Sequence, residues 1–85
     1  MAHHILVVDD AQTLRDLATM TLEVLGDYEV ETATNGLEAQ EALESGRRFD
    51  LVLTDLDIPL MGGDELIAWM KSEPSLQNIP VIVLT

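Results

Sequence analysis

The sequence predicts an α/β fold in which helices cover both faces of a parallel sheet. Uninterrupted apolar runs at 5–8, 51–53 and 81–84 are typical of parallel strands buried on both faces. Segments with helical spacing of apolar residues separate these runs. The resulting order, β-α-β-α-β-α-β, predicts a doubly wound sheet with right-handed crossovers.

The first strand is expected at 5–8 and the first helix at Gln12–Leu25. Apolar residues recur in the helix at spacings of three and four, at Leu14, Leu17, Ala18, Leu22 and Leu25. Gly26 is expected to end this helix, because glycine adopts the left-handed conformation that terminates helices.

The second strand, Tyr28–Ala33, alternates apolar and polar residues more than the others do, as an edge strand does. Asn35-Gly36 predicts a turn into a second helix at 37–45, which Gly46 ends. The sequence therefore places a weak strand at the margin of the sheet.

The third strand, at 51–53, leads to a helix at 63–72 with Leu66, Ile67 and Met70 on its core face. A loop containing two prolines then leads to the last strand, at 81–84. Phe49 and Trp69 are expected to be packing residues.

Length and composition indicate one small domain with a packed core. The chain has 85 residues, 47% of them hydrophobic, and no cysteine. A thiolate metal site, a cysteine nucleophile and a disulfide framework are therefore excluded. No apolar stretch approaches the ~20 residues of a membrane span, so we expect a soluble, cytoplasmic protein without a membrane partner.

The charge balance excludes one class of partner. Sixteen acidic and four basic residues give a formal net charge of −12. Phosphate backbones repel such a chain, so no direct nucleic-acid binding is expected.

Acidic residues follow two of the apolar runs. Asp9-Asp10 ends the run 5–8, and Asp55 ends the run 51–54. Ligands of open parallel sheets bind outside the carboxyl ends of the strands. Carboxylates crowded there repel one another unless a cation lies between them, and oxygen ligands favour Mg²⁺. Alternatively, Asp9-Asp10 caps the first helix.

Together, these segments resemble the receiver domains of two-component response regulators. The resemblance spans 5–85 and depends on the order and spacing of several short motifs: Ile5-Leu6-Val7-Val8-Asp9-Asp10, Asn35-Gly36, Asp50-Leu51-Val52-Leu53-Thr54-Asp55, Pro59, Gly62-Gly63 and Pro80-Val81-Ile82-Val83-Leu84-Thr85. It implies a flavodoxin-like sheet of strand order 2-1-3-4.

The resemblance also implies a function. Asp55 would accept a phosphoryl group from a sensor histidine kinase, a phosphotransfer protein or a small phosphodonor. Mg²⁺ would be held by Asp9, Asp10, Asp55 and the backbone carbonyl of Asp57, and the Thr85 hydroxyl would sense the phosphoryl group. Such a domain assists its own phosphorylation and dephosphorylation without being an enzyme with external turnover.

Two features depart from the family pattern. Complete receivers continue with a fifth strand and two more helices, which carry a lysine that pairs with the phosphoryl group. We therefore expect residues 1–85 to be a single receiver domain that is incomplete at its C-terminus. Gly62-Gly63 also stands where Asp-Gly is more usual.

An incomplete receiver exposes its fourth strand and one side of its first helix. An apolar strand at the edge of a sheet is a template for pairing with another chain. We therefore expect self-association or domain swapping through these two elements, or docking on a partner.

Three alternatives remain open. The chain is a receiver-like docking or dimerisation module that is not phosphorylated, or a fragment of a complete receiver. More remotely, Asp55-Leu56-Asp57 is similar to the Asp-x-Asp motif of haloacid-dehalogenase-type phosphatases. That motif normally opens its fold, whereas here a β-α-β-α segment precedes it.

Overall fold

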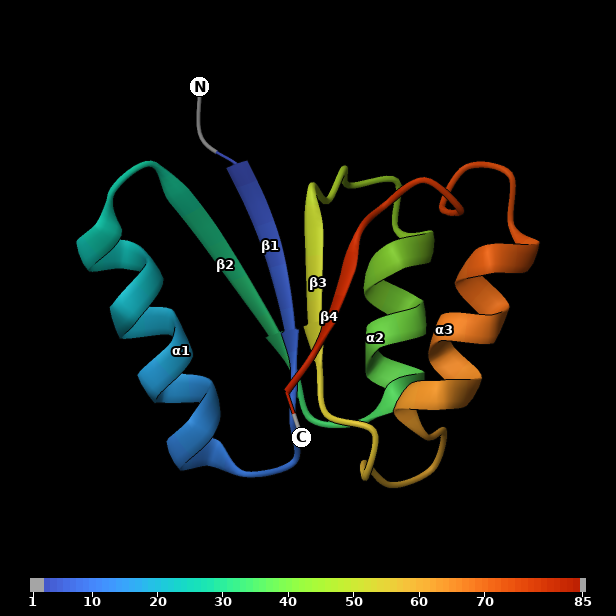
Figure 1. The fold of residues 1–85 in the computed structure, drawn as a ribbon, viewed down its shortest axis with the longest axis horizontal. Coiled ribbons are helices and arrows are strands. Elements are labelled where there is room, and N and C mark those ends of the chain that lie inside the picture. The colour runs from blue at the N-terminus through green and yellow to red at the C-terminus, as the bar shows by residue number, and fades with distance from the viewer. Residues whose placement is uncertain (1–2, 85) are drawn as a thin grey trace.

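The computed structural model describes residues 3–84 and confirms the predicted α/β architecture. Strands alternate with helices along the chain, in the order β1 (His3–Val8), α1 (Gln12–Leu25), β2 (Tyr28–Ala33), α2 (Gly36–Glu44), β3 (Leu51–Thr54), α3 (Gly63–Ser72) and β4 (Val81–Val83). The strands pair in parallel in the order β2-β1-β3-β4, as expected. α1 lies on one side of the sheet, and α2 and α3 lie on the other (Figure 1).

Several element boundaries differ from the prediction by one or two residues, among them the ends of α2 at Glu44 and of β3 at Thr54. β1 begins at His3, because its register with β2 already pairs His3 with Tyr28. α2 begins at Gly36 rather than at residue 37, because the Asn35 side chain caps it by accepting a hydrogen bond from the Glu38 N–H. β4 ends at Val83, although the Leu84 N–H still donates to the Thr54 carbonyl at 2.9 Å.

The main core lies between the sheet and the helices α2 and α3. It is built from buried apolar residues of β1, β3 and both helices, among them Leu6, Val8, Val52, Leu66 and Met70. Phe49 belongs to this core and Trp69 packs against it, so both are packing residues as predicted. This face of the sheet is closed.

The other face carries α1 alone, which packs mainly on β1 and β2. Beneath it, Ile5 and Val7 are buried. None of the residues of α1 itself, all of which the structure describes, is buried. Leu14 and Leu17 remain 49% and 58% exposed. The predicted apolar side of this helix is therefore only partly covered.

Two glycines allow the loops at the carboxyl end of the sheet to pack closely. A Cβ on Gly63 would lie 2.3 Å from the Asp55 carbonyl oxygen, and one on Gly36 would lie 1.9 Å from the Met61 carbonyl oxygen. Only a residue without a side chain fits such approaches. Gly63 thereby allows α3 to start directly against the end of β3, where Asp55 lies.

Among residues 3–84, no helix is both long and apolar enough to cross a membrane.

Candidate functional site

The predicted site residues follow the ends of two neighbouring strands. Val8 and Thr54, the last residues of β1 and β3, are register partners. The Asp55 N–H donates to the Val8 carbonyl at 3.1 Å, which continues the ladder past the end of β3. The tertiary structure thus brings the Asp9-Asp10 segment and Asp55 to the same edge of the sheet, as predicted.

Asp9 is the most buried of these acids, with 2% of its surface exposed. Its Oδ1 accepts a hydrogen bond from the Ala11 N–H at 2.9 Å. Its Oδ2 is buried and has no hydrogen-bond partner among the described residues. A buried carboxylate oxygen without a partner is costly, and a bound cation is one way to offset that cost.

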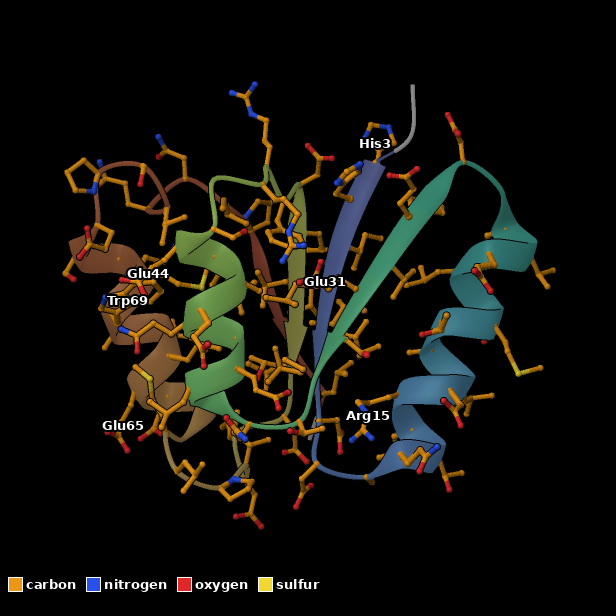
Figure 2. All side chains as sticks on the ribbon, turned by 180° about the vertical axis from the view of Figure 1, so that it is seen from behind. His3, Arg15, Glu31, Glu44, Glu65 and Trp69 are labelled. Carbon is orange, nitrogen blue, oxygen red and sulfur yellow. The ribbon has the colours of Figure 1, made fainter. Side chains whose placement is uncertain are left out.

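Asp10 is exposed, and the neighbouring loop is fixed by a basic side chain. Arg15, in the first turns of α1, donates from Nη1 to the Asp9 carbonyl at 2.8 Å. Figure 2 shows Arg15 at the carboxyl end of the sheet, far from His3 at the opposite end. The role of Arg15 was not predicted from the sequence, although it is one of only four basic residues and follows an acidic pair closely.

The alternative interpretation of Asp9-Asp10 as a helix cap is wrong. Ala11 is the N-cap of α1, and its methyl side chain makes no capping hydrogen bond. The Asp9 side chain instead closes a turn onto the Ala11 N–H, before the helix begins. Its carboxylate therefore serves the loop at the strand end and leaves the first turn of α1 without a side-chain cap.

Asp55 is half-buried at the start of the loop between β3 and α3. Its Oδ1 accepts the Asp57 N–H at 3.0 Å, which fixes one carboxylate oxygen. The buried Thr54 hydroxyl donates to the Asp55 carbonyl at 2.9 Å. Further along this loop, Leu60 has φ 68°, a left-handed conformation that is unfavourable for a residue with a side chain.

The predicted metal ligands do not form a closed cluster. Within residues 3–84, no group of three or more His, Cys, Asp and Glu residues is arranged to hold a metal ion. Asp9 and Asp55 each use one oxygen for a backbone N–H, and Asp10 is exposed. The donor set still fits Mg²⁺, because it consists of oxygens and includes the unpartnered Asp9 Oδ2.

The predicted phosphoryl-sensing residue, Thr85, lies outside the described residues. Its neighbour Leu84 is fixed beside the site by the hydrogen bond from its N–H to the Thr54 carbonyl, at 2.9 Å. The residue directly before Thr85 is therefore hydrogen-bonded to the last residue of β3.

Curated relatives include bacterial chemotaxis and sensor proteins. The chain is 36% identical over 81 residues to the chemotaxis protein CheY1 of Helicobacter pylori, covering 95% of this chain and 65% of that protein. It is 43% identical over 82 residues to the CAI-1 autoinducer sensor kinase/phosphatase CqsS of Vibrio cholerae, covering 95% of this chain and 12% of that one. The chain therefore spans less than two thirds of the length of CheY1.

Solved structures agree with these relatives. The signal receiver domain of a histidine kinase from Syntrophus aciditrophicus matches 99% of this chain and 62% of its own, with a TM-score of 0.92 and 42% identity. The receiver domain of the sensor histidine kinase PA1611 from Pseudomonas aeruginosa matches 100% of this chain and 68% of its own, with a TM-score of 0.91 and 26% identity. The PA1611 structure has a magnesium ion coordinated in its active-site cleft.

The family model of the response regulator receiver domain matches residues 5–85, nearly the whole chain. Receiver domains are signalling modules of two-component systems, and their partners are histidine kinases or phosphotransfer proteins. The strand order, the acids at the strand ends and the similarity to known receivers agree, and this chain belongs to the response regulator receiver domain family.

Proposed function

We propose that this receiver domain accepts a phosphoryl group on Asp55 in a Mg²⁺-dependent reaction and switches a downstream output. The donor is a sensor histidine kinase or a phosphotransfer protein. The observation that carries the proposal is the buried, unpartnered Asp9 Oδ2 at the strand end beside Asp55. We place the domain in the cytoplasm, where histidine kinases obtain ATP.

The reaction requires a carboxylate nucleophile held in position. The Asp57 N–H fixes Oδ1 of Asp55, so we assign the attack to Oδ2. Oδ2 forms a bond to phosphorus while the bond from phosphorus to the donor nitrogen breaks, and the electron pair of that bond stays on the histidine. The product is an acyl phosphate on Asp55.

The charge on the transferring phosphoryl group must be offset. Asp9, Asp10, Asp55 and the Asp57 carbonyl would hold Mg²⁺, which supplies positive charge to the phosphoryl oxygens when bound. Arg15 fixes the Asp9 backbone and so holds the loop that carries two of these ligands. We assign to the Thr85 hydroxyl the hydrogen bond that reports the phosphoryl group.

Phosphorylation of the purified chain by acetyl phosphate, detected by intact-mass spectrometry, tests the proposal. We expect a phosphorylated species that disappears on removal of Mg²⁺ with EDTA and in Asp55→Asn. Asp16→Asn, which removes an exposed acid of α1, is the matched control and should be phosphorylated like the wild type. Equal phosphorylation of Asp55→Asn and the wild type would contradict the proposal.

One observation favours a second candidate, a docking module that is not phosphorylated. Among the described residues the carboxylates are not arranged as a metal cluster. This candidate predicts that neither Mg²⁺ nor acetyl phosphate moves the amide NMR signals of Asp9, Asp10 and Asp55. The phosphatase alternative is disfavoured, because receiver domains are signalling modules and not enzymes with external turnover.

A further inference from the structure

A hollow of about 650 Å³ lies at the amino ends of β3 and β4, at the end of the sheet opposite the acidic site. Two loops form most of it, residues 46–50 before β3 and residues 75–80 before β4. In Figure 2, His3 marks this end of the sheet and Arg15 marks the end that carries the acids. The volume is within the range of pockets that bind small molecules.

The hollow has an apolar floor and a polar rim. Leu43, Phe49 and Leu76 line it and are at most 8% exposed, so they form the floor. Arg48 and Asn78 also line it and are exposed, so they belong to the rim. Pockets with an apolar lining and a few polar groups bind ligands that have an apolar body and a polar or charged end.

Two arginines border the hollow, and they differ in their partners. Arg47 is engaged, because its Nη2 lies 2.7 Å from Oε2 of Glu31. Arg48 forms no hydrogen bond or ion pair with any other residue in the range 3–84. The guanidinium group of Arg48 is therefore available to a ligand in the hollow.

Basic residues are concentrated at this end of the molecule. Of the four in the chain, Arg47 and Arg48 line the hollow, and Lys71 lies beside it, with its Nζ donating to the Gln77 carbonyl at 3.3 Å. The fourth, Arg15, lies at the acidic end of the sheet. The net charge of −12 repels anions from most of the surface, so this hollow is the favoured place for a negatively charged ligand.

The charge of the ligand is limited by Asp50, which also lines the hollow. Its Oδ2 accepts the His4 N–H at 2.8 Å and lies 3.7 Å from Nδ1 of His3, so this oxygen is directed toward β1. One available guanidinium group near a carboxylate matches a ligand with a single negative charge. A phosphate monoester carries nearly two charges at pH 7 and would be repelled by Asp50.

We propose that this hollow binds a small organic carboxylate with an aromatic or branched apolar body. The carboxylate accepts two hydrogen bonds from the guanidinium group of Arg48, a geometry for which arginine is well suited. The apolar body covers Phe49 and Leu76 and is thereby removed from water. The site is separate from the phosphoacceptor Asp55, which lies at the other end of β3.

Amide NMR of the isotope-labelled chain tests the proposal, with 1-naphthoate as the ligand. We expect saturable shifts at residues 46–50 and 75–80. The neutral analogue 1-naphthalenemethanol has the same apolar body without the carboxylate and should bind at least about fivefold more weakly, because it forms no ion pair with Arg48.

Matched variants locate the charge that binds the carboxylate. Arg48→Gln removes the available guanidinium group, and we expect it to weaken 1-naphthoate binding at least about fivefold. Asn78→Asp adds a negative charge to the rim without changing the size of the side chain, and it should weaken binding similarly. Lys71→Gln is the control, since it changes the net charge as Arg48→Gln does but Lys71 does not line the hollow, and it should bind like the wild type. The dispersion of the amide spectrum establishes that each variant is folded.

Several outcomes would overturn the inference. The absence of saturable shifts is one, and shifts confined to another surface are a second. Equal binding of 1-naphthoate and its neutral analogue would exclude recognition of the carboxylate. Equal weakening by Arg48→Gln and Lys71→Gln would show a general effect of charge and no site at Arg48. None of these measurements involves phosphoryl transfer, so the result is independent of Asp55.

Discussion

The two faces of the sheet are covered to very different extents. On the α2–α3 face, Leu66 and Met70 are 0% and 1% exposed, and they pack on strand residues that are equally buried. On the α1 face, no residue of the helix is buried and Leu17 is 58% exposed. Because hydrophobic stabilisation scales with the apolar area removed from water, the α2–α3 face carries most of the stability.

The helices of the two faces also begin differently. α2 starts with a variant of the capping box: the N-cap Asn35 accepts the Glu38 N–H, and Glu38 accepts the N–H of Thr34, the residue before the cap, both at 2.8 Å. The N-cap residue of α1 is Ala11, whose side chain makes no capping hydrogen bond. The α2–α3 face is therefore closed, whereas the α1 face is only partly covered by its helix.

Truncating one leucine on each face should produce the largest difference in the free energy of unfolding between the two faces. Leu66→Ala should lower the free energy of unfolding by about 2–5 kcal/mol, because it leaves a cavity in a closed core. Leu17→Ala should change it by less than about 0.5 kcal/mol, since the side chain is largely exposed. Urea denaturation followed by circular dichroism measures both, and equal losses would refute the contrast between the faces.

The next effect concerns the close approach of α3 to the strand that carries Asp55. Gly63→Ala places a Cβ 2.3 Å from the Asp55 carbonyl oxygen, so the backbone must shift. We expect a loss of about 1–3 kcal/mol in urea denaturation, typical of overpacking. Asp64→Ala, at the next and exposed position of α3, is the control and should lose little. A fully stable Gly63→Ala would show that this contact is not required.

Removing the cap of α2 and adding a cap to α1 should change the stability of the protein by smaller amounts and in opposite directions. Asn35→Ala removes the cap of α2 and should cost about 1 kcal/mol. Ala11→Ser offers α1 a cap that it lacks and should gain about 0.5 kcal/mol or more. The midpoints of thermal unfolding of the two variants and the wild type measure both effects. A stabilising Asn35→Ala would contradict the role of the capping box.

The smallest effect is a pH dependence that belongs to α2. The Thr34 backbone N–H donates to Glu38, and this hydrogen bond holds the pKa of Glu38 below its ordinary value of 4.5. The charged form is therefore favoured by folding, and its contribution is fully present above pH 4.5 and is lost as the pH falls through the lowered pKa. In Glu38→Gln, the free energy of unfolding should therefore depend less on pH at acidic pH than it does in the wild type. In Glu41→Gln, which changes an exposed acid further along α2, this pH dependence should be the same as in the wild type.

Much of the fold was predictable because it depends on local patterns. Apolar runs and three-and-four spacing identified every strand and helix to within two residues. The placement of Asp9 and Asp55 at the same end of the sheet was predictable because parallel strands present their carboxyl ends together. The contact between Arg15 and the Asp9 carbonyl was not, since no local pattern links a helix side chain to that carbonyl.

The sequence by itself determined the order of the elements, the position of β2 at an edge of the sheet and the presence of acids at the strand ends. These features depend on side-chain periodicity and chain direction, which are local properties. Only the tertiary structure decided that Asp9 Oδ2 is buried without a partner, that Gly63 meets the Asp55 carbonyl, and that α1 leaves a trough beside Leu53. These features arise where segments distant in the chain approach one another, and their packing depends on shapes that no single segment specifies.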